Sequence, residues 1–494
     1  MTSNRTQLGI ETLQRDAAAL FSFVDSIGLH CYQDSESPTY LAPSVDFFKY
    51  VRELGEATKA YLNVFPSQAP GDRRLYQDYR QKLETIRSSW FELHQLIKPA
   101  ADADTLNIPY TLVEALTRRL NWVQRFETTK FAILHFDELN YFEVPVSDIR
   151  EATNRLRSII PDAPAFRENL GLIGIPYSQS SSLHLNYLIC HEMGHFVFQE
   201  SKLKDKLLPH IETSIVQALY PQLEQTSSDD LDWSKDRLAS WSEELFCDLF
   251  AVWLIGPCYT LAYVELFGLT TVLDPASTRG FSPTAGSLEF GRIHPADLFR
   301  LKQQVILLRR LNWWGEVDAI RSHYVDVLRC AVEIDDSELE FRTHEQPPDY
   351  SRKTLKAFLA LAPRIMELVI DVMRDSKGDA LEPGVSNYQR FVGPIGEYLR
   401  RAVVPSTILE GDDHWYPDPV ALLNASMKFY LESIEGLMNT IEAQKTSLAG
   451  HRSRWIQRVE SLTAKAIEDY QLLVAEKGAL QVGSSFKRPN PKSS

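Results

Sequence analysis

The stretch LHLNYLICHEMGHFVFQE, residues 183–200, combines a helical pattern with a metal-binding spacing. His191 and His195 are four residues apart, so on a helix both imidazoles project from one face and can reach one metal ion. Glu192 then lies beside the ion without binding it. The alternative is a buried helix whose histidines only make hydrogen bonds. The opposite face of the helix is apolar and predicts burial against a core: Leu185, Ile189, Met193 and Phe196.

A second apolar stretch supplies carboxylates at the same spacing. Glu244 and Asp248 lie four residues apart in the segment SEELFCDLFA, residues 242–251. Buried carboxylates need a partner. A metal ion would supply one to Glu244, and Asp248 could accept the Nδ1–H of a ligating histidine. Glu243 is the alternative ligand and Cys247 lies beside Asp248, but we favour Glu244 because a carboxylate follows it four residues later.

Together these segments resemble the gluzincin metallopeptidases, in which HExxH is followed by a later helix bearing ExxxD. A third segment, HPADLFR at residues 294–300, is similar to the HPxxxxR segment of the CAAX prenyl protease-like branch of that group. The resemblance covers residues 171–300 only, and the multiple membrane helices common in that branch are missing. It implies a zinc-dependent peptidase in which two histidines and Glu244 bind Zn²⁺ and Glu192 acts as general base.

The third segment adds two candidate catalytic residues. We expect His294 and Arg300 to stabilise the oxyanion of the tetrahedral intermediate, because one metal ion only partly offsets its charge. The alternative is a helix N-terminus with Pro295 in the first turn, in which Arg300 makes a structural ion pair with Asp297.

Two features before the metal-binding residues are candidates for substrate contact. Residues 171–177 form a short extended run, GLIGIPY, which we expect to be an edge strand that pairs with an extended peptide. His184 lies two helical turns before His191 and shares its face. We expect it at the rim of the site or against substrate, because two histidines and a glutamate already fill the protein positions of a catalytic zinc site.

The rest of the chain is dominated by helical patterns. The segment 240–243 has the form of a capping box that opens the second apolar helix. Two short strands are expected at residues 131–136 and 141–146. The other helices are expected at residues 12–27, 44–64, 72–97, 110–126, 352–373, 420–444 and 454–477.

These elements predict an α+β fold that is predominantly α-helical. Its centre is a zincin-like core with a small sheet and an active-site helix, flanked by helical domains. The expected boundaries are an N-terminal helical region (1–130), the metallopeptidase core (131–300), a C-terminal helical region (301–482) and a disordered tail (483–494).

Composition limits the partners and the compartment. A net charge of −14 over 494 residues argues against nucleic acid as a partner. Five widely spaced cysteines and an N-terminus without an apolar signal region favour the reducing cytoplasm. The apolar run at residues 249–273 is interrupted at Gly256 and Pro257, which favours two packed helices over a membrane span.

We therefore expect a zinc metallopeptidase acting on a peptide or protein substrate. Two alternatives remain. One is a zincin-fold regulatory or scaffold protein without turnover, using its helical flanks to bind a protein partner. The other is a zinc hydrolase of a non-peptide amide.

Overall fold

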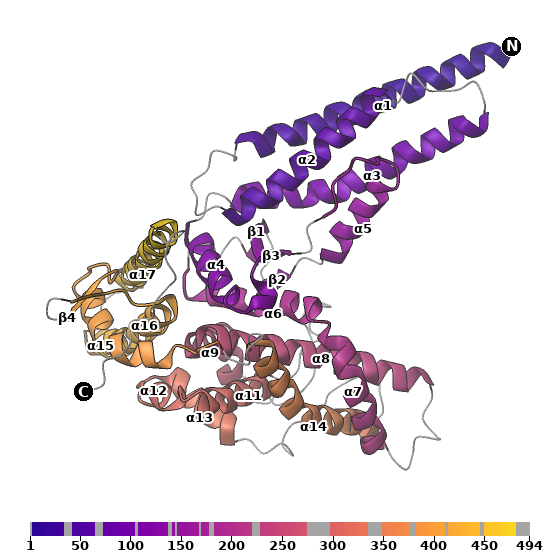
Figure 1. Ribbon diagram of the computed structural model, residues 1–494. Helices are drawn as coiled ribbons and strands as arrows, with labels where there is room; N and C mark the ends of the chain where they lie inside the picture. Colours follow the sequence, from indigo (N-terminus) through magenta and orange to yellow (C-terminus); the bar gives the residue numbers. More distant parts are fainter. Residues whose placement is uncertain are drawn as a thin grey trace. The chain divides into compact units, whose positions relative to one another are not determined.

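The chain is mostly helical, and the strands among the residues that the structure describes form two small sheets (Figure 1). The predominantly helical fold expected from the sequence is therefore confirmed. Internal contacts divide the chain into two compact units: residues 1–117 with 126–181, and residues 118–125 with 182–494. The computed structural model describes residues 2–33, 42–64, 73–103, 107–136, 141–143, 146–166, 169–176, 182–219, 228–273, 297–333, 348–374, 381–410, 413–444 and 449–480.

Long helices and a three-stranded sheet make up the first unit. Its core includes the fully buried Trp90 of α3, whose indole N–H donates to Thr58 of α2 at 3.1 Å. The helices expected in this region are confirmed, except that the last ends at Leu120, before a separate 3₁₀ turn at Gln124–Phe126. The helices are α1 (Thr2–Gln33), α2 (Ala42–Val64), α3 (Arg73–Ala103), most of α4 (Asn107–Leu120) and α5 (Val146–Arg157).

The sheet of this unit has the strand order β1-β3-β2. Strand β1 (Lys130–Phe136) runs parallel to β3 (Leu170–Pro176), and the short β2 (Phe142–Glu143) pairs antiparallel with β3 on its other side. A parallel pair needs a crossover connection, and α5 lies within it. All seven residues of β3 are buried. The strand β3 lies between β1 and β2, so the prediction of an edge strand that pairs with a substrate peptide is wrong.

The second unit contains the segment with the two candidate metal-binding histidines. A 3₁₀ turn, η5 (Leu185–Leu188), precedes helix α6 (Ile189–Glu200), so the expected helix over 183–200 starts with a tighter turn. Helix α8 (Ser228–Ile255) packs against α6. The other elements are α7 (Leu203–Leu219), α9 (Pro257–Leu273), α11 (Asp297–Arg310), α12 (Trp314–Asp318), α13 (His323–Glu333), α14 (Pro348–Val372), α15 (Val385–Arg400), β4 (Ile408–Glu410), β5 (Asp413–Trp415), α16 (Pro419–Gln444) and α17 (Ala449–Leu480).

Helix α8 begins well before the expected capping box. The Ser240 hydroxyl donates to the carbonyl of Asp236 one turn earlier, within the helix, so Ser240 is not an N-cap and that prediction is wrong. At its other end, α8 stops before Gly256, which has a φ of +75°. Pro257 then starts α9, as the break in the apolar run predicted. Within the described ranges, no helix is long and apolar enough to cross a membrane.

The two units divide the chain differently from the predicted core at 131–300. The three-stranded sheet falls in the same unit as the N-terminal helices, whereas α6 and α8 fall in the same unit as the C-terminal helices. The predicted tail at 483–494 lies outside the described residues.

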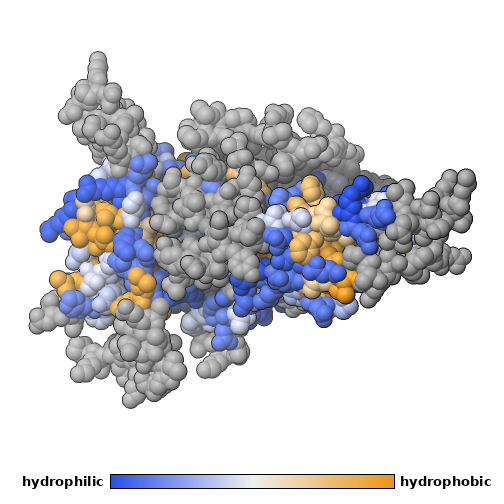
Figure 2. All heavy atoms as spheres, turned by 90° about the horizontal axis from the view of Figure 1, so that it is seen from above, coloured by the Kyte–Doolittle hydropathy of each residue, from blue (hydrophilic) through white to orange (hydrophobic). Residues whose placement is uncertain are grey.

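On the face shown in Figure 2, hydrophobic residues form small separate groups among hydrophilic ones. A protein partner on the helical flanks stays a prediction.

Candidate metal centre

Helices α6 and α8 pack directly on each other at Gly194. A methyl group added to Gly194 would stand 2.8 Å from the Cα atom of Cys247, closer than atoms can approach without movement. A larger residue would therefore push apart the two helices that carry the candidate ligands. This packing gives the glycine of the HExxH segment a structural role that the sequence analysis did not foresee.

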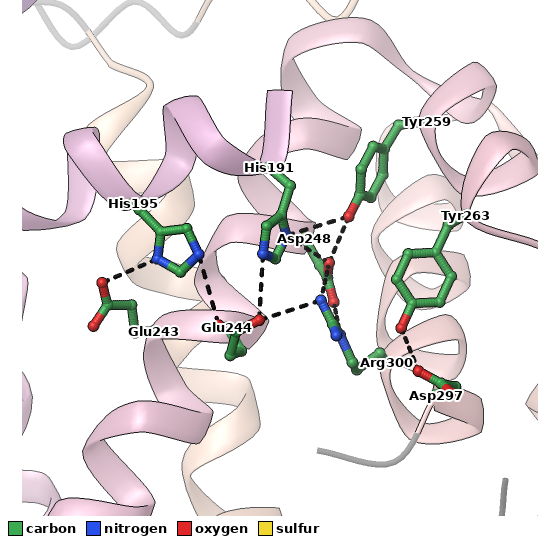
Figure 3. Close-up of polar contacts among 9 residues, drawn as sticks. All are labelled: His191, His195, Glu243, Glu244, Asp248, Tyr259, Tyr263, Asp297 and Arg300. Atoms are coloured by element: carbon green, nitrogen blue, oxygen red, sulfur yellow. Dashed lines mark hydrogen bonds and ion pairs between the residues drawn. The ribbon is translucent and has the colours of Figure 1, made fainter. Parts of the chain in front are cut away.

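Both histidines of α6 point toward Glu244 of α8 (Figure 3). Nε2 of His191 lies 3.3 Å from Glu244 Oε2, and Nε2 of His195 lies 3.6 Å from Glu244 Oε1. His191 and Glu244 are buried. The fold thus brings together the three residues that the sequence analysis selected as ligands.

The other ring nitrogen of each histidine contacts a different carboxylate. His191 Nδ1 lies 3.0 Å from Asp248 Oδ1, and His195 Nδ1 lies 3.1 Å from Glu243 Oε1. Since a carboxylate can only accept a hydrogen bond, these contacts place a proton on Nδ1 and turn Nε2 toward Glu244. Asp248 occupies the place expected for it. Glu243, which the sequence offered only as an alternative ligand, makes the equivalent contact with the second histidine.

Asp248 is fully buried, and Arg300 of α11 balances its charge. Arg300 donates from Nε to Oδ2 at 2.6 Å and from Nη2 to Oδ1 at 2.8 Å. The hydroxyl of Tyr259 donates to Oδ1 at 2.6 Å. Burial alone would raise the pKa of Asp248, but the Arg300 charge and the hydrogen bonds hold that pKa well below its usual range. The carboxylate therefore stays ionised beside His191.

The alternative weighed for Arg300 was a structural ion pair with Asp297, and the structure shows such a pair with a different partner. Arg300 pairs with Asp248, and its Nη2 also lies 3.5 Å from Glu244 Oε2. Its guanidinium group lies 5.0 Å from the ring centroid of Tyr263, whose hydroxyl donates to Asp297 at 2.6 Å. A direct role for Arg300 at an oxyanion stays a prediction.

Both histidines have raised pKa values. Burial lowers the pKa of His191, but Asp248 and Glu244 outweigh burial and raise it to about 10. For His195, burial is likewise outweighed by carboxylates, Glu243 foremost, and the pKa is raised. A divalent cation could take the place of these protons among the carboxylates.

Cys247 also reaches the two histidines. Its sulfur and one nitrogen of each ring lie within 4.8 Å of one another, so His191, His195 and Cys247 form a largely buried group that could hold a metal ion. Burial, and then the nearby carboxylates led by Glu243, raise the pKa of the Cys247 thiol well above its usual range. This shift opposes the thiolate form that binds metals.

His184 lies in a separate buried cluster, so the prediction that it forms the rim of the site is wrong. Its Nε2 lies 3.3 Å from Ser426 Oγ of α16, and its Nδ1 lies 3.4 Å from Glu460 Oε1 of α17. Burial lowers the pKa of His184 to about 3. The partners of His184 come from α16 and α17, near the C-terminal end of the sequence. The spacing between His184 and His191 could not predict these partners, because it describes only one short segment.

Two predicted catalytic residues remain. Glu192 lies in the first turn of α6, is 7% exposed, and acts electrostatically on both His195 and Cys247. His294 lies outside the described residues.

The sequence analysis did not select Tyr259, because in the sequence it is one of several aromatic residues in an apolar run.

Comparisons with protein-family models, curated proteins and solved structures find no match to this chain.

Proposed function

We propose that the protein is a zinc-dependent metallohydrolase that cleaves peptide bonds, with zinc bound by His191, His195 and Glu244. The arrangement of the ring nitrogens carries this proposal. Both Nδ1 atoms contact carboxylates, while both Nε2 atoms face Glu244. Histidines that bind zinc have this arrangement, with the outer nitrogen held by a carboxylate or carbonyl.

The spacing of the candidate ligand atoms is close to that of ligand atoms on one zinc ion. Zinc binds imidazole nitrogen and carboxylate oxygen at about 2.0–2.2 Å, so two such ligand atoms on a tetrahedral ion lie roughly 3.3–3.5 Å apart. Nε2 of His191 lies 3.3 Å from Oε2 of Glu244, and Nε2 of His195 lies 3.6 Å from Oε1 of the same carboxylate. Three protein ligands leave one position open, which is typical of catalytic zinc sites.

Glu244 is a better third ligand than Cys247. Its two carboxylate oxygens each face one histidine Nε2, whereas Cys247 packs against the backbone of α6 at Gly194. The raised pKa of the Cys247 thiol also opposes ligation. Glu244→Gln should therefore lose zinc and Cys247→Ser should retain it; the reverse result would exchange the two roles.

The surrounding residues suit hydrolysis. A zinc ion bound here would act as a Lewis acid on the substrate carbonyl and lower the pKa of a bound water. Glu192 would accept the proton of the attacking water and deliver it to the leaving nitrogen. Its burial in the first turn of α6, next to His191 in the sequence, supports this role. Asp248 and Glu243 would hold the two imidazoles in orientation.

The choice of a peptide substrate rests on the resemblance of the HExxH and ExxxD segments to gluzincin metallopeptidases. A non-peptide amide would engage the same groups. We place the protein in the cytoplasm because four of its cysteines are free thiols: Cys190, Cys247, Cys258 and Cys330.

Glu192→Gln tests the proposal, with Glu200→Gln as the matched control at the exposed end of the same helix. We expect Glu192→Gln to keep zinc and the fold while losing hydrolysis of an internally quenched peptide library by several orders of magnitude, because the proton acceptor is removed. Glu200→Gln should behave like the parent.

Other outcomes separate the alternatives. Equal hydrolysis by the parent and Glu192→Gln would reject the mechanism. A parent that binds zinc but cleaves no peptide would favour a non-peptide amidase if small amides are hydrolysed, and a scaffold without turnover if they are not.

A further inference from the structure

Tyr259 lies on the far side of His191 from Glu244 (Figure 3). It is fully buried in the first turn of α9, and its hydroxyl oxygen lies 2.6 Å from Asp248 Oδ1 and 3.3 Å from His191 Nδ1. The three groups form a triangle on the outer edge of the imidazole. Because the Nε2 atom faces the opposite way, Tyr259 does not reach the atoms that would react.

A phenol hydroxyl suits this position because it can donate one hydrogen bond and accept others. Asp248 is ionised and can only accept, so Tyr259 donates to it. The same oxygen is then available to accept from the Nδ1–H of His191. The tyrosine therefore contacts both His191 and Asp248, and it adds one more donor to the two from Arg300 and the one from His191 that Asp248 already accepts.

The turn between α8 and α9 fixes the tyrosine in place. Gly256 adopts a left-handed conformation there, with a φ of +75°. The side chain of Asn424 donates to the carbonyl of Ile255 at 2.7 Å and accepts from the backbone N–H of Cys258 at 2.8 Å. Asp248 and Tyr259 thus lie on two helices whose connection is itself held by hydrogen bonds.

We propose that Tyr259 is a positioning residue of the metal site, which acts through Asp248 to hold His191 with Nε2 directed at the ion. The proposal rests on the proposed function, because it assumes that His191 binds the metal. It requires the hydroxyl of Tyr259 and not only its ring.

Tyr263 provides a matched control one helical turn later on α9. It too is buried, and its hydroxyl donates to a carboxylate at 2.6 Å, but that carboxylate belongs to Asp297 and not to Asp248. Tyr259→Phe and Tyr263→Phe therefore remove the same atom from similar surroundings. Only the first removes a donor to the metal site.

The test measures the zinc affinity of the parent and both variants by competition with a chromophoric chelator, with circular dichroism to check the fold. We expect Tyr259→Phe to weaken zinc binding about tenfold, the lower end of the range for outer partners of metal ligands. Tyr263→Phe should stay within about twofold. Equal affinities for the parent and Tyr259→Phe, or equal losses in the two variants, would overturn the proposal.

A double-mutant cycle with Asp248→Asn separates positioning from general packing. If Tyr259 acts through Asp248, Tyr259→Phe should cost much less affinity in the Asp248→Asn background than in the parent. Equal costs in both backgrounds would make Tyr259 a packing residue. A parent that binds no zinc would reject the proposed function and this inference together, whereas zinc binding unaffected by Tyr259→Phe rejects only the inference.

Discussion

His184 and His191 are both buried, but their surroundings give them opposite properties. The pKa of His184 is lowered to about 3 by burial. The pKa of His191 is raised to about 10, because Asp248 and Glu244 outweigh burial. Each histidine lies near a carboxylate, so a nearby carboxylate alone does not decide which of them is suited to a metal.

The carboxylates themselves differ. Glu460, beside His184, accepts hydrogen bonds from the Ser182 hydroxyl and the His184 backbone N–H, and burial raises its pKa to about 7. Asp248, beside His191, is kept ionised by Arg300. Burial without a counter-charge favours neutral groups, whereas a paired guanidinium keeps a buried charge in place. The first cluster suits a structural role and the second a cation site.

The largest expected difference between substitutions at His191 and at His184 is in the amount of bound zinc. His191→Ala should reduce bound zinc to background, because it removes one of the three proposed protein ligands. His184→Ala should keep zinc and instead lower the free energy of unfolding by about 1–3 kcal/mol, because Ser426 and Glu460 lose a buried partner. Metal analysis and urea denaturation check both variants. Zinc loss only in His184→Ala would reverse the assignment of the two histidines.

The pH dependence of stability should sharpen the comparison. The folded-state pKa of Glu460 is raised from 4.5 to about 7. This group therefore contributes stability below pH 4.5 that is lost as the pH rises to 7, and the loss is ~3 kcal/mol. His184, lowered from 6.5 to about 3, acts in the opposite direction and contributes stability that is gained as pH rises from 3 to 6.5. The two effects oppose each other between pH 4.5 and 6.5.

Glu460→Gln should remove the first effect and leave the second. Its free energy of unfolding should therefore rise more steeply than that of the parent from pH 4.5 to 6.5. Denaturation curves at the two pH values provide the measurement. Parallel profiles for the parent and the variant would show that Glu460 does not titrate in this range.

Neutralising the two carboxylates should affect the metal differently. Asp248→Asn should weaken zinc binding by about 10 to 100-fold, because it removes the charged acceptor of His191. Glu460→Gln should leave zinc affinity within about twofold of the parent, since it contacts no candidate ligand. Chelator competition measures both. An equal loss in the two variants would mean that zinc affinity reports general stability.

Among the carboxylates that contact the candidate ligands, the smallest expected effect is at Glu243. Its side chain is 26% exposed, whereas that of Asp248 is fully buried and paired with Arg300. Glu243→Gln should therefore weaken zinc binding only several-fold, less than Asp248→Asn, because water can partly replace an exposed acceptor. Competition with a chelator ranks the zinc affinities of Glu243→Gln and Asp248→Asn. A larger loss for Glu243→Gln would make it the ligand in place of Glu244.

Sequence patterns located the helices better than their ends or partners. The period of apolar residues predicted α2, α3, α16 and α17 closely, because it depends only on neighbouring turns. The capping box at Ser240 failed because its four residues also fit the interior of a longer helix. The strand β3 was found, but its central place was not, since sheet order depends on which segments pair.

The sequence by itself determined the local geometry of the candidate site. A spacing of four residues puts His191 beside His195, and Glu244 beside Asp248, whatever the helices pack against. Tertiary structure alone decided which nitrogen faces which carboxylate, and it brought Arg300 and Tyr259 to Asp248 from other helices. The physical reason is that helical periodicity acts over one turn, whereas ionisation and hydrogen bonding depend on every group that packing brings near.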